Sequence, residues 1–253
     1  MVVFENVSKS FESKNDDTQI NVINHLSFKV EDGEFFCIVG PSGCGKSTII
    51  NLLAGFLKPD EGKILIDECL VTKPGAKRAV VFQDYILFPW KTVAQNIEFG
   101  LKFKISNKIK RKEKVKFFLE KIRLEKFANY YPFEISGGMK QKVALARALA
   151  VEPKIILMDE PFASLDQQTR DLLQEELIKI KNEFSQTIIF VTHNIEEALF
   201  LGDRILVLTQ RPAKIKNLIN NPFPSPRNPD IRNKPDFIDI RHKIWHLLRE
   251  EAN

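Results

Sequence analysis

The sequence predicts an α/β protein built on a parallel sheet, with a block of helices inserted into the chain that forms the sheet. Three observations support this class. A glycine-rich stretch at 40–48 lies between two apolar runs. Apolar runs at 155–158 and 187–191 flank a helical pattern at 169–184, which is the strand–helix–strand order of a parallel sheet. Between the first stretch and this unit, residues 84–150 carry long, lysine-rich helical patterns.

The chain before the glycine-rich stretch predicts an N-terminal β region of short strands, at 2–4, 26–30 and 35–39. The dipeptide Asp32-Gly33 separates the last two runs and is typical of a β-hairpin turn. A polar loop is expected at 15–18. Phe11 comes just before it, and a flat apolar ring there suits either stacking on an adenine base or a place in the core.

The remaining elements follow in order. A turn at 58–62 precedes strands expected at 63–67 and 79–82, and a further strand is expected at 205–208. One buried helical face is predicted by its spacing, on Val115, Phe118, Leu119 and Ile122. A proline-rich connector at 221–229 cannot be regular helix or a central strand. A short amphipathic helix then ends the chain, and we expect it to dock on its own domain through Ile240, Ile244, Leu247 and Leu248.

Composition narrows the class of protein only partly. The net charge of +5 suits contact with nucleic acid, an anionic membrane face or a nucleotide, and a solvated helix face also explains the lysines concentrated at 102–126. No apolar run is long enough to span a membrane, and the start of the chain lacks the features of a signal peptide. Cys37, Cys44 and Cys69 lack metal-ligand spacing and are expected to be reduced thiols.

The glycine-rich stretch has the strand–loop–helix context of a phosphate-binding P-loop. Its glycines let several backbone N–H groups point at one anion, and the helix that starts near Lys46 adds the positive end of its dipole. Lys46 can reach the β- and γ-phosphates, and the Ser47 hydroxyl can ligate Mg²⁺. The predicted ATP-contacting set is Gly40, Pro41, Ser42, Gly43, Cys44, Gly45, Lys46, Ser47 and Thr48, with Phe11 beneath the base.

Two further motifs add chemistry. The strand Ile155 to Met158 ends in Asp159 and Glu160, as a Walker B site does: Asp159 would hold Mg²⁺ and Glu160 would polarise the attacking water. Ser136-Gly137-Gly138 at a helix start makes a second anion site. Two anion sites and one Walker B motif make sense if the second anion site serves nucleotide bound by another copy of the chain.

These motifs resemble those of the ATPase subunit of an ABC transporter. The resemblance covers residues 1–210 and comprises six motifs in the right order: Gly40–Thr48 (Walker A), Gln83 (Q-loop), Ser136-Gly137-Gly138 (signature), Ile155–Glu160 (Walker B), Ser164-Leu165-Asp166 (D-loop) and His193 (switch histidine). The signature departs slightly from the usual pattern, with Ile135 for leucine and Lys140-Gln-Lys142 for Gln-Gln-Arg. Lysine keeps the charge of arginine but loses its planar fork.

The resemblance implies a P-loop NTPase fold with a RecA-like parallel sheet core, an N-terminal antiparallel β region and a helical signature subdomain at 84–150 inserted into an ATPase domain at 1–210. Residues 211–253 would form the connector and the C-terminal helix. It further implies a head-to-tail dimer that sandwiches two ATP molecules. His193 would contact the γ-phosphate, Gln83 would sense Mg²⁺ and water, and Asp166 would bridge the dimer interface.

The segments around Gln83, Asp159 and the proline-rich tail resemble the importer group for nitrate, sulfonates, taurine and thiamine-precursor pyrimidines. That group implies a separate membrane permease, an external solute-binding protein, no nucleic-acid partner, and a peripheral position on the cytoplasmic face of the membrane. The permease would dock beside Leu87-Phe88-Pro89-Trp90, unless Trp90 is buried. An exporter or lipoprotein-release ATPase is the alternative. A DNA-associated ATPase is disfavoured because such chains insert a long coiled coil or zinc modules between the Walker A motif and the signature, whereas fewer than a hundred residues separate Thr48 from Ser136 here.

Overall fold

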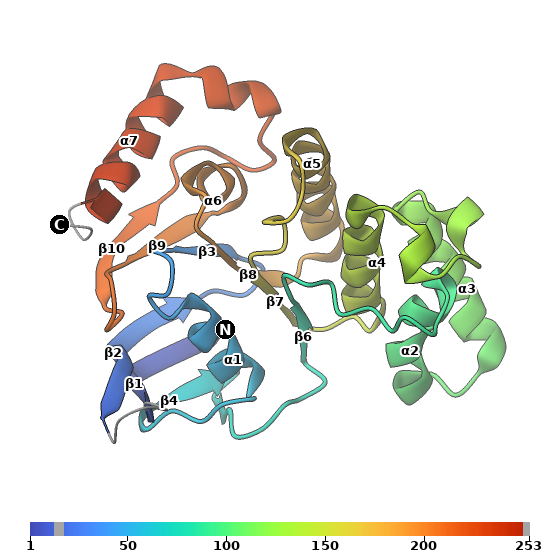
Figure 1. Cartoon of the computed structure of the whole chain (residues 1–253), viewed down its shortest axis with the longest axis horizontal. Helices are drawn as coiled ribbons and strands as arrows, with labels where there is room; N and C mark the ends of the chain where they lie inside the picture. The colour runs from blue at the N-terminus through green and yellow to red at the C-terminus, as the bar shows by residue number, and fades with distance from the viewer. Residues whose placement is uncertain (13–17, 250–253) are drawn as a thin grey trace. The chain divides into compact units, whose positions relative to one another are not determined.

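The computed structural model describes residues 1–12 and 18–249. It divides into two compact units, Met1–Gly75 with Leu177–Asn253, and Ala76–Glu176 (Figure 1). The predicted polar loop at 15–18 lies outside the described residues except for Thr18. The division at residue 210 and the subdomain at 84–150 stay predictions.

The first unit contains an antiparallel sheet in the strand order β2-β1-β4-β5. Its strands are β1 (Val2–Glu12), β2 (Gln19–Val30), β4 (Glu61–Ile66) and β5 (Cys69–Leu70). The first two strands are longer than predicted, because shifts in their register let the pairing continue past the alternating apolar run. The predicted antiparallel β region is therefore present.

The same unit holds the strands that carry the glycine-rich loop. Here β3 (Phe35–Val39) pairs in parallel with both β8 (Thr187–Thr192) and β9 (Arg204–Leu208). β10 (Ile215–Asn220), which the sequence did not reveal, adds to β9 in antiparallel fashion. All residues of β3 and β8 are buried. This confirms the prediction of a parallel sheet in an α/β fold.

The hairpin predicted at Asp32-Gly33 is wrong. β2 pairs with β1, whereas β3 pairs with β8 and β9, so the two strands flanking this turn belong to different sheets. Gly33 still adopts a φ of 74°, and its N–H donates to Thr187 Oγ1 at 3.0 Å. The glycine thus serves a turn between sheets.

Stacked rings join the antiparallel sheet to β3. The rings of Phe4 and Phe28 lie 4.4 Å apart between centroids, and those of Phe28 and Phe36 lie 5.5 Å apart, with interplanar angles of 16° and 7°. All three side chains are buried. Stacked aromatic pairs add about 0.5–1.5 kcal/mol beyond the burial of their area, so this stack fixes the N-terminal sheet against the strand that leads into the loop.

The helices of the first unit are α1 (Lys46–Ala54), α6 (Ile195–Leu201), a 3₁₀ helix η3 (Pro229–Asn233) and α7 (Pro235–Arg249), together with the second half of α5 (Gln167–Phe184). α7 packs on α6 and β9, with Phe237 and Ile244 fully buried. The predicted docking of the C-terminal helix is confirmed. Of the predicted contact residues, Ile244 is buried and Ile240, Leu247 and Leu248 are half-buried, whereas Phe237 was not predicted.

The second unit carries two parallel strands, β6 (Arg78–Val81) and β7 (Ile155–Asp159). Its helices form a cluster (Figure 1): α2 (Val93–Lys104), α3 (Lys108–Lys121), α4 (Gly137–Ala150), and the 3₁₀ helices η1 (Glu125–Phe127) and η2 (Pro132–Glu134). Val115, Phe118, Leu119 and Ile122 are all buried, as their helical spacing predicts. Thr92 begins α2 with a capping box closed by Gln95, which satisfies two of its free N–H groups.

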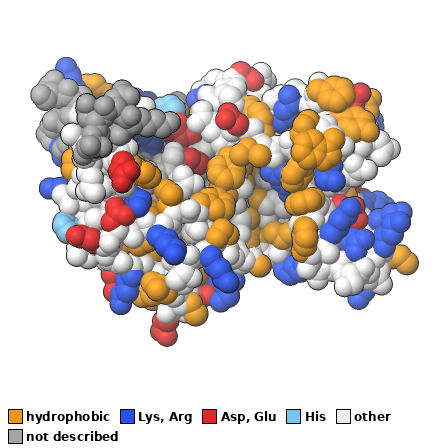
Figure 2. Space-filling view, turned by 60° about the horizontal axis from the view of Figure 1, so that its bottom comes forward, with side chains coloured by type: hydrophobic (Ala, Val, Ile, Leu, Met, Phe, Trp, Pro, Cys, Tyr) orange, Lys and Arg blue, Asp and Glu red, His pale blue; other side chains and the backbone are white. Residues whose placement is uncertain are grey.

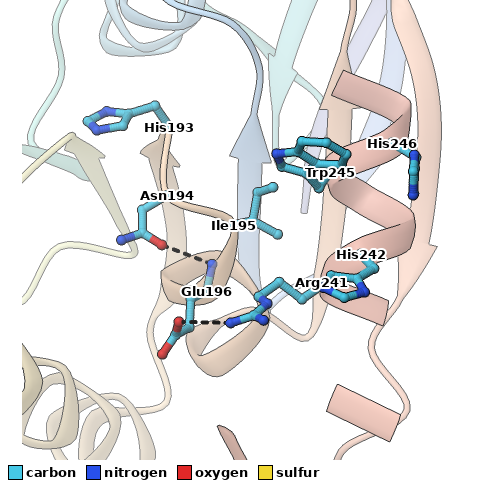
Figure 3. Close-up of a pocket in the computed structure, with 8 residues that line it drawn as sticks. All are labelled: His193, Asn194, Ile195, Glu196, Arg241, His242, Trp245 and His246. Atoms are coloured by element: carbon cyan, nitrogen blue, oxygen red, sulfur yellow. Dashed lines mark hydrogen bonds and ion pairs between the residues drawn. The ribbon is translucent and has the colours of Figure 1, made fainter. Parts of the chain in front are cut away.

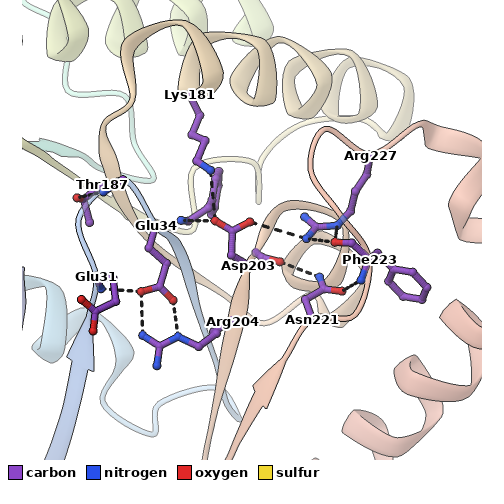
Figure 4. Close-up of polar contacts among 12 residues, drawn as sticks. Glu31, Glu34, Lys181, Thr187, Asp203, Arg204, Asn221, Phe223 and Arg227 are labelled. Atoms are coloured by element: carbon purple, nitrogen blue, oxygen red, sulfur yellow. Dashed lines mark hydrogen bonds and ion pairs between the residues drawn. The ribbon is translucent and has the colours of Figure 1, made fainter.

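The proline-rich connector is held by a buried arginine (Figure 4). The Arg227 guanidinium donates to Phe223 O at 2.7 and 3.1 Å and to Phe200 O at 3.0 Å, and it lies 3.9 Å from Asp203. Asp203 in turn accepts from the backbone N–H of Phe35 and from Lys181. One side chain thereby satisfies the Phe223 carbonyl of the connector and the Phe200 carbonyl at the end of α6, neither of which is paired in a ladder.

We expect Arg227→Ala to lower the free energy of unfolding by about 2–4 kcal/mol, because the buried Phe200 carbonyl and the part-buried Phe223 carbonyl lose charge-assisted hydrogen bonds. Urea denaturation followed by circular dichroism measures the change. Arg227→Lys keeps the charge but not the planar fork of the guanidinium, so its free energy of unfolding should lie between those of Arg227→Ala and the wild type. The exposed Arg249 offers a control, and Arg249→Ala should change stability by less than about 0.5 kcal/mol. Equal stability of Arg227→Ala and the wild type would contradict this role.

Candidate functional site

The glycine-rich loop leaves the carboxyl end of β3 and enters α1. Two of its glycines adopt backbone conformations with positive φ, which other residues rarely adopt. Gly43 has a φ of 74°, and Gly45 has a φ of 118° at the N-cap of α1. A Cβ at Gly45 would also come within 3.0 Å of Val22 Cγ1. Ser42, Gly43 and Ser47 are exposed. The loop therefore presents the N-terminus of a helix to solvent, in the arrangement that binds phosphate.

Lys46 folds back over this loop. Its ammonium group donates to Gly40 O at 3.0 Å and to Pro41 O at 2.9 Å, and the residue is 5% exposed. These contacts hold the charge beside the loop before any nucleotide arrives. Burial raises the pKa of the Cys44 thiol, although Lys46 opposes the shift. A buried, protonated thiol is a poor nucleophile, so Cys44, which is free and buried, is chemically quiet within the loop.

Arg211 also contacts the loop, and the sequence did not reveal this. Its guanidinium donates to Gly43 O at 2.7 and 3.1 Å. Arg211 lies in the segment between β9 and β10, far from the loop in sequence, so no local pattern could predict the contact. It places a second cation next to the predicted phosphate site.

His193 lies at the same edge of the sheet as the loop. Val39, the last residue of β3, pairs with Thr192, the last residue of β8, so Gly40 and His193 follow side by side at the carboxyl ends of two neighbouring parallel strands. The turn after His193 is fixed by Asn194, whose side chain accepts from the N–H groups of Glu196 and Glu197. The structure thus brings His193 next to the P-loop, where ligands bind in open α/β sheets.

A pocket of about 630 Å³ lies between the His193 turn and α7. It is lined by His193, Asn194, Ile195, Glu196, Arg241, His242, Trp245 and His246. Figure 3 shows the His193 ring pointing away from Trp245 and Arg241. Arg241 lies 3.7 Å from Glu196 across the pocket.

Phe11 lies near the end of β1, opposite Ile20 of β2. The ring is 38% exposed, and the Lys9 ammonium lies 5.5 Å from its centroid. The alternative that Phe11 is a core residue is therefore wrong. Its exposure leaves the ring available to a base, and stacking on adenine stays a prediction.

The second unit holds the other motifs. Val81 of β6 pairs with Met158 of β7, so Gln83 and Glu160 follow at one level beyond the carboxyl ends of two parallel strands. Gln83 is exposed, and Glu160 is half-buried. Glu160 adopts a φ of 45°, a left-handed backbone conformation that is unfavourable for a residue with a side chain.

The segment after Gln83 is tied to the helix that follows the signature. Arg147 of α4 donates to Ile86 O at 2.7 Å and to Tyr85 O at 3.2 Å, and its guanidinium lies over the ring of Phe88. The Tyr85 hydroxyl and Ser164 Oγ share a hydrogen bond of 2.6 Å. These contacts join the Q-loop to α4 and to the D-loop. Tyr85 and Arg147 thus hold this segment in place, through contacts that the motifs alone did not identify.

The signature motif begins a helix as predicted, and Ser136 caps that helix, α4. Ser136 Oγ accepts from the N–H of Met139 at 3.3 Å, and both Ser136 and Gly137 are exposed. Gly138 must lack a side chain, because a Cβ there would lie 2.5 Å from Thr169 Cγ2. The result is a solvent-facing N-terminus on a helix of 14 residues, at the place where the sequence predicts a second anion site. Anion binding there stays a prediction.

Asp166 begins α5 in a similar way. Its Oδ1 accepts from the N–H of Thr169 at 2.9 Å, and this hydrogen bond lowers the pKa of the carboxyl. Lys142, which stands where arginine is commoner, forms a single ion pair of 2.9 Å with Glu176. Lysine at this position thus keeps an ion pair with Glu176 but cannot form the bidentate contact that an arginine could make.

The site residues suit Mg²⁺ and a nucleotide triphosphate. Ser47, Asp159 and Gln83 each carry a side-chain oxygen of the hard kind that Mg²⁺ prefers, and their role as its ligands stays a prediction. In the described ranges, no cluster of three or more His, Cys, Asp or Glu side chains could cage a metal. Mg²⁺ is commonly held by one or two protein oxygens, water and substrate phosphates, so these residues fit an ion that arrives with ATP.

Comparison with known proteins agrees with the site. Residues 23–163 match the ABC transporter family. The chain is 44% identical to an aliphatic sulfonates import ATP-binding protein of Bacillus cereus, covering 96% of this chain and 94% of that protein. It is 45% identical to a nitrate import ATP-binding protein of Synechocystis, covering 90% of this chain and 88% of that protein. Among solved structures, a dimeric post-hydrolysis ATP-binding cassette bound to ADP and Pi has a TM-score of 0.78 at 33% identity, covering 88% of this chain and all of that one.

Together, the fold, the phosphate loop and the matches define a P-loop ATPase. The chain belongs to the ABC transporter family, in which it is an ATP-binding subunit with ABC-type ATPase activity. Within residues 1–12 and 18–249, no helix combines the length and apolarity needed to cross a bilayer.

Proposed function

We propose that this subunit hydrolyses Mg·ATP with the residues assigned above. Lys46 and the N–H groups of the P-loop bind the β- and γ-phosphates, because the lysine already lies buried against that loop. Ser47, Asp159 and Gln83 hold Mg²⁺, which neutralises charge on the phosphates. Glu160 accepts a proton from the attacking water, and His193 contacts the γ-phosphate. The register that places His193 beside Gly40 is the observation that supports this arrangement best.

We further propose that two copies complete the site. The exposed N-terminus of α4 at Ser136 faces the γ-phosphate held by the P-loop of the partner, and Asp166 lies at the interface. The exposed, capped helix start and the dimeric form of the related cassette with ADP and Pi both support this. In a lone subunit, no second anion site would face the γ-phosphate bound at the P-loop.

The transported solute is proposed to be a small oxyanion or a related polar solute of the nitrate, sulfonate, taurine or pyrimidine-precursor type. The support is the pair of relatives named for sulfonate and nitrate import. Uptake would use a separate permease and an external binding protein, with this subunit on the cytoplasmic face of the membrane. The test is to purify the binding protein encoded beside this chain and titrate it with nitrate, taurine, alkanesulfonates and pyrimidine precursors. Preference for a sugar or a metal would refute the solute class.

The permease is proposed to dock at Trp90. This side chain is 69% exposed, so the alternative of a buried Trp90 is wrong, and its ring lies 5.6 Å from that of Phe88. Phe88 in turn lies under Arg147 of α4. A partner that binds Trp90 would therefore contact the Leu87-Phe88-Pro89-Trp90 segment, which follows the Q-loop and is linked to α4 through Arg147.

We expect Trp90→Ala to weaken binding of the subunit to its permease in detergent by thirtyfold or more, as loss of an aromatic hot spot does. Hydrolysis by the isolated subunit should stay within twofold of the wild type. Phe103→Ala, which removes another exposed ring of the same unit, is the matched control and should leave permease affinity unchanged. Unaltered affinity in Trp90→Ala would remove this residue from the docking surface.

A further inference from the structure

The positive charge of the chain is concentrated in one short segment, residues 102–116, here named the basic segment. It contains eight Lys or Arg and a single acidic residue, a net charge of +7, whereas the whole chain carries +5. The rest of the chain is therefore slightly acidic. Figure 2 shows Lys and Arg side chains gathered at the right of the view, where α2 and α3 lie in Figure 1.

Only some of these basic side chains form ion pairs with acidic side chains of the same chain. Lys102 and Arg111 lie near Glu98, Lys104 and Lys114 near Glu152, and Lys116 near Glu120. By contrast, the ammonium groups of Lys108, Lys110 and Lys112 have no ion pair or hydrogen bond within the described ranges. All three are exposed on the first turns of α3. Three uncompensated charges thus project from one end of the helical cluster.

Apolar side chains stand among these lysines. Phe103, on the last turn of α2, is 82% exposed, and Ile109, on the first turn of α3, is 69% exposed. The rings of Phe103 and Phe99 lie edge to face, with a centroid distance of 5.6 Å. Large apolar side chains this exposed between cations are typical of segments that enter the interface of a bilayer.

The turn between α2 and α3 is held in place. Arg111 donates to Ile105 O at 2.8 Å and to Ser106 O at 2.9 Å, and its Nε donates to Glu98 at 3.1 Å. Asn107 accepts from the N–H groups of Ile109 and Lys110, which caps α3. The lysines and the two apolar side chains are therefore presented on a structured tip, so little ordering is needed on binding.

We propose that the basic segment binds the surface of an anionic phospholipid bilayer, with Lys108, Lys110 and Lys112 at the headgroup phosphates and with Phe103 and Ile109 inserted between headgroups. Clusters of four to eight Lys or Arg on a surface helix are typical of anionic lipid recognition. Nucleic acid would use the lysines equally well, but it offers no apolar layer for Ile109. The inference goes beyond ATP hydrolysis and needs only that the subunit works beside a membrane.

The test uses the purified full chain and vesicles without permease, so that its result is separate from that of the transport assays. At 50 mM salt, we expect the chain to sediment with phosphatidylglycerol vesicles and not with phosphatidylcholine vesicles, and to be released by 0.5 M salt. Each lysine near an anionic surface contributes about fivefold to binding. K108Q/K110Q/K112Q should therefore bind about a hundredfold more weakly, and F103S/I109S at least tenfold more weakly.

K58Q/K179Q/K243Q, which removes three exposed lysines elsewhere, is the matched control and should bind vesicles as the wild type does. Circular dichroism and ATP hydrolysis confirm that each variant is folded. Equal binding to the two kinds of vesicle, no binding to the anionic ones, or equal losses in the control would overturn the proposal. So would a duplex DNA or RNA probe that binds more tightly than the vesicles and loses affinity in the triple variant.

Discussion

Glu160→Gln is expected to retain ATP and to lose turnover. The amide keeps the size and hydrogen-bonding reach of the carboxylate at the carboxyl end of β7, but it cannot take a proton from water. General-base catalysis contributes about 10²–10⁴ to such a step, so phosphate release should fall by that factor. ATP affinity should stay within about twofold, because the assigned binding groups lie on the P-loop.

The same variant should accumulate as a dimer. If two copies sandwich ATP and hydrolysis is what separates them, then blocking hydrolysis leaves the closed state in place. Size-exclusion chromatography with ATP, and with ADP as the reference, measures the shift. Glu152 provides a close control, since it is an acidic residue of the same unit that also has a positive φ, of 47°. Glu152→Gln should keep wild-type turnover, whereas wild-type turnover in Glu160→Gln would remove Glu160 from the catalytic role.

The P-loop could be predicted because its signal is local. Glycine spacing, a buried strand before it and a helix after it all lie within about twenty residues, and the structure confirms each element. The capped helix at Ser136 was predictable for the same reason. The adjacency of His193 and Gly40 was not visible locally, and it follows from the pairing of β3 with β8 across the chain.

The wrong hairpin prediction and the features that the sequence did not reveal both involve contacts between distant parts of the chain. Asp32-Gly33 has the residues of a hairpin turn, but β3 does not pair with β2. It pairs instead with two parallel strands, β8 and β9. β10 is an edge strand with exposed and half-buried residues, so its alternation is weak. Arg211 and Tyr85 make their contacts across long sequence separations, where neither residue type nor spacing carries a signal.

Lys46→Ala is expected to abolish measurable nucleotide binding. Lys46 is the charged side chain buried against the loop, and charge-assisted hydrogen bonds to phosphate are each about 1.5–3 kcal/mol. Losing two of them should raise the dissociation constant for ATP by at least a hundredfold. Isothermal titration with Mg·ATP measures it directly.

The ammonium group of Lys46 also bridges two loop carbonyls, so its removal could disturb the loop as well as the charge. Lys46→Arg separates these effects: it keeps the charge, but its planar guanidinium does not match a site that holds a compact ammonium. We therefore expect partial affinity from Lys46→Arg and none from Lys46→Ala, with both folded by circular dichroism. Lys58→Ala, at an exposed lysine after α1, should bind ATP as the wild type does. Affinity retained in Lys46→Ala would mean that the loop binds phosphate through its backbone and Arg211, with no need of this lysine.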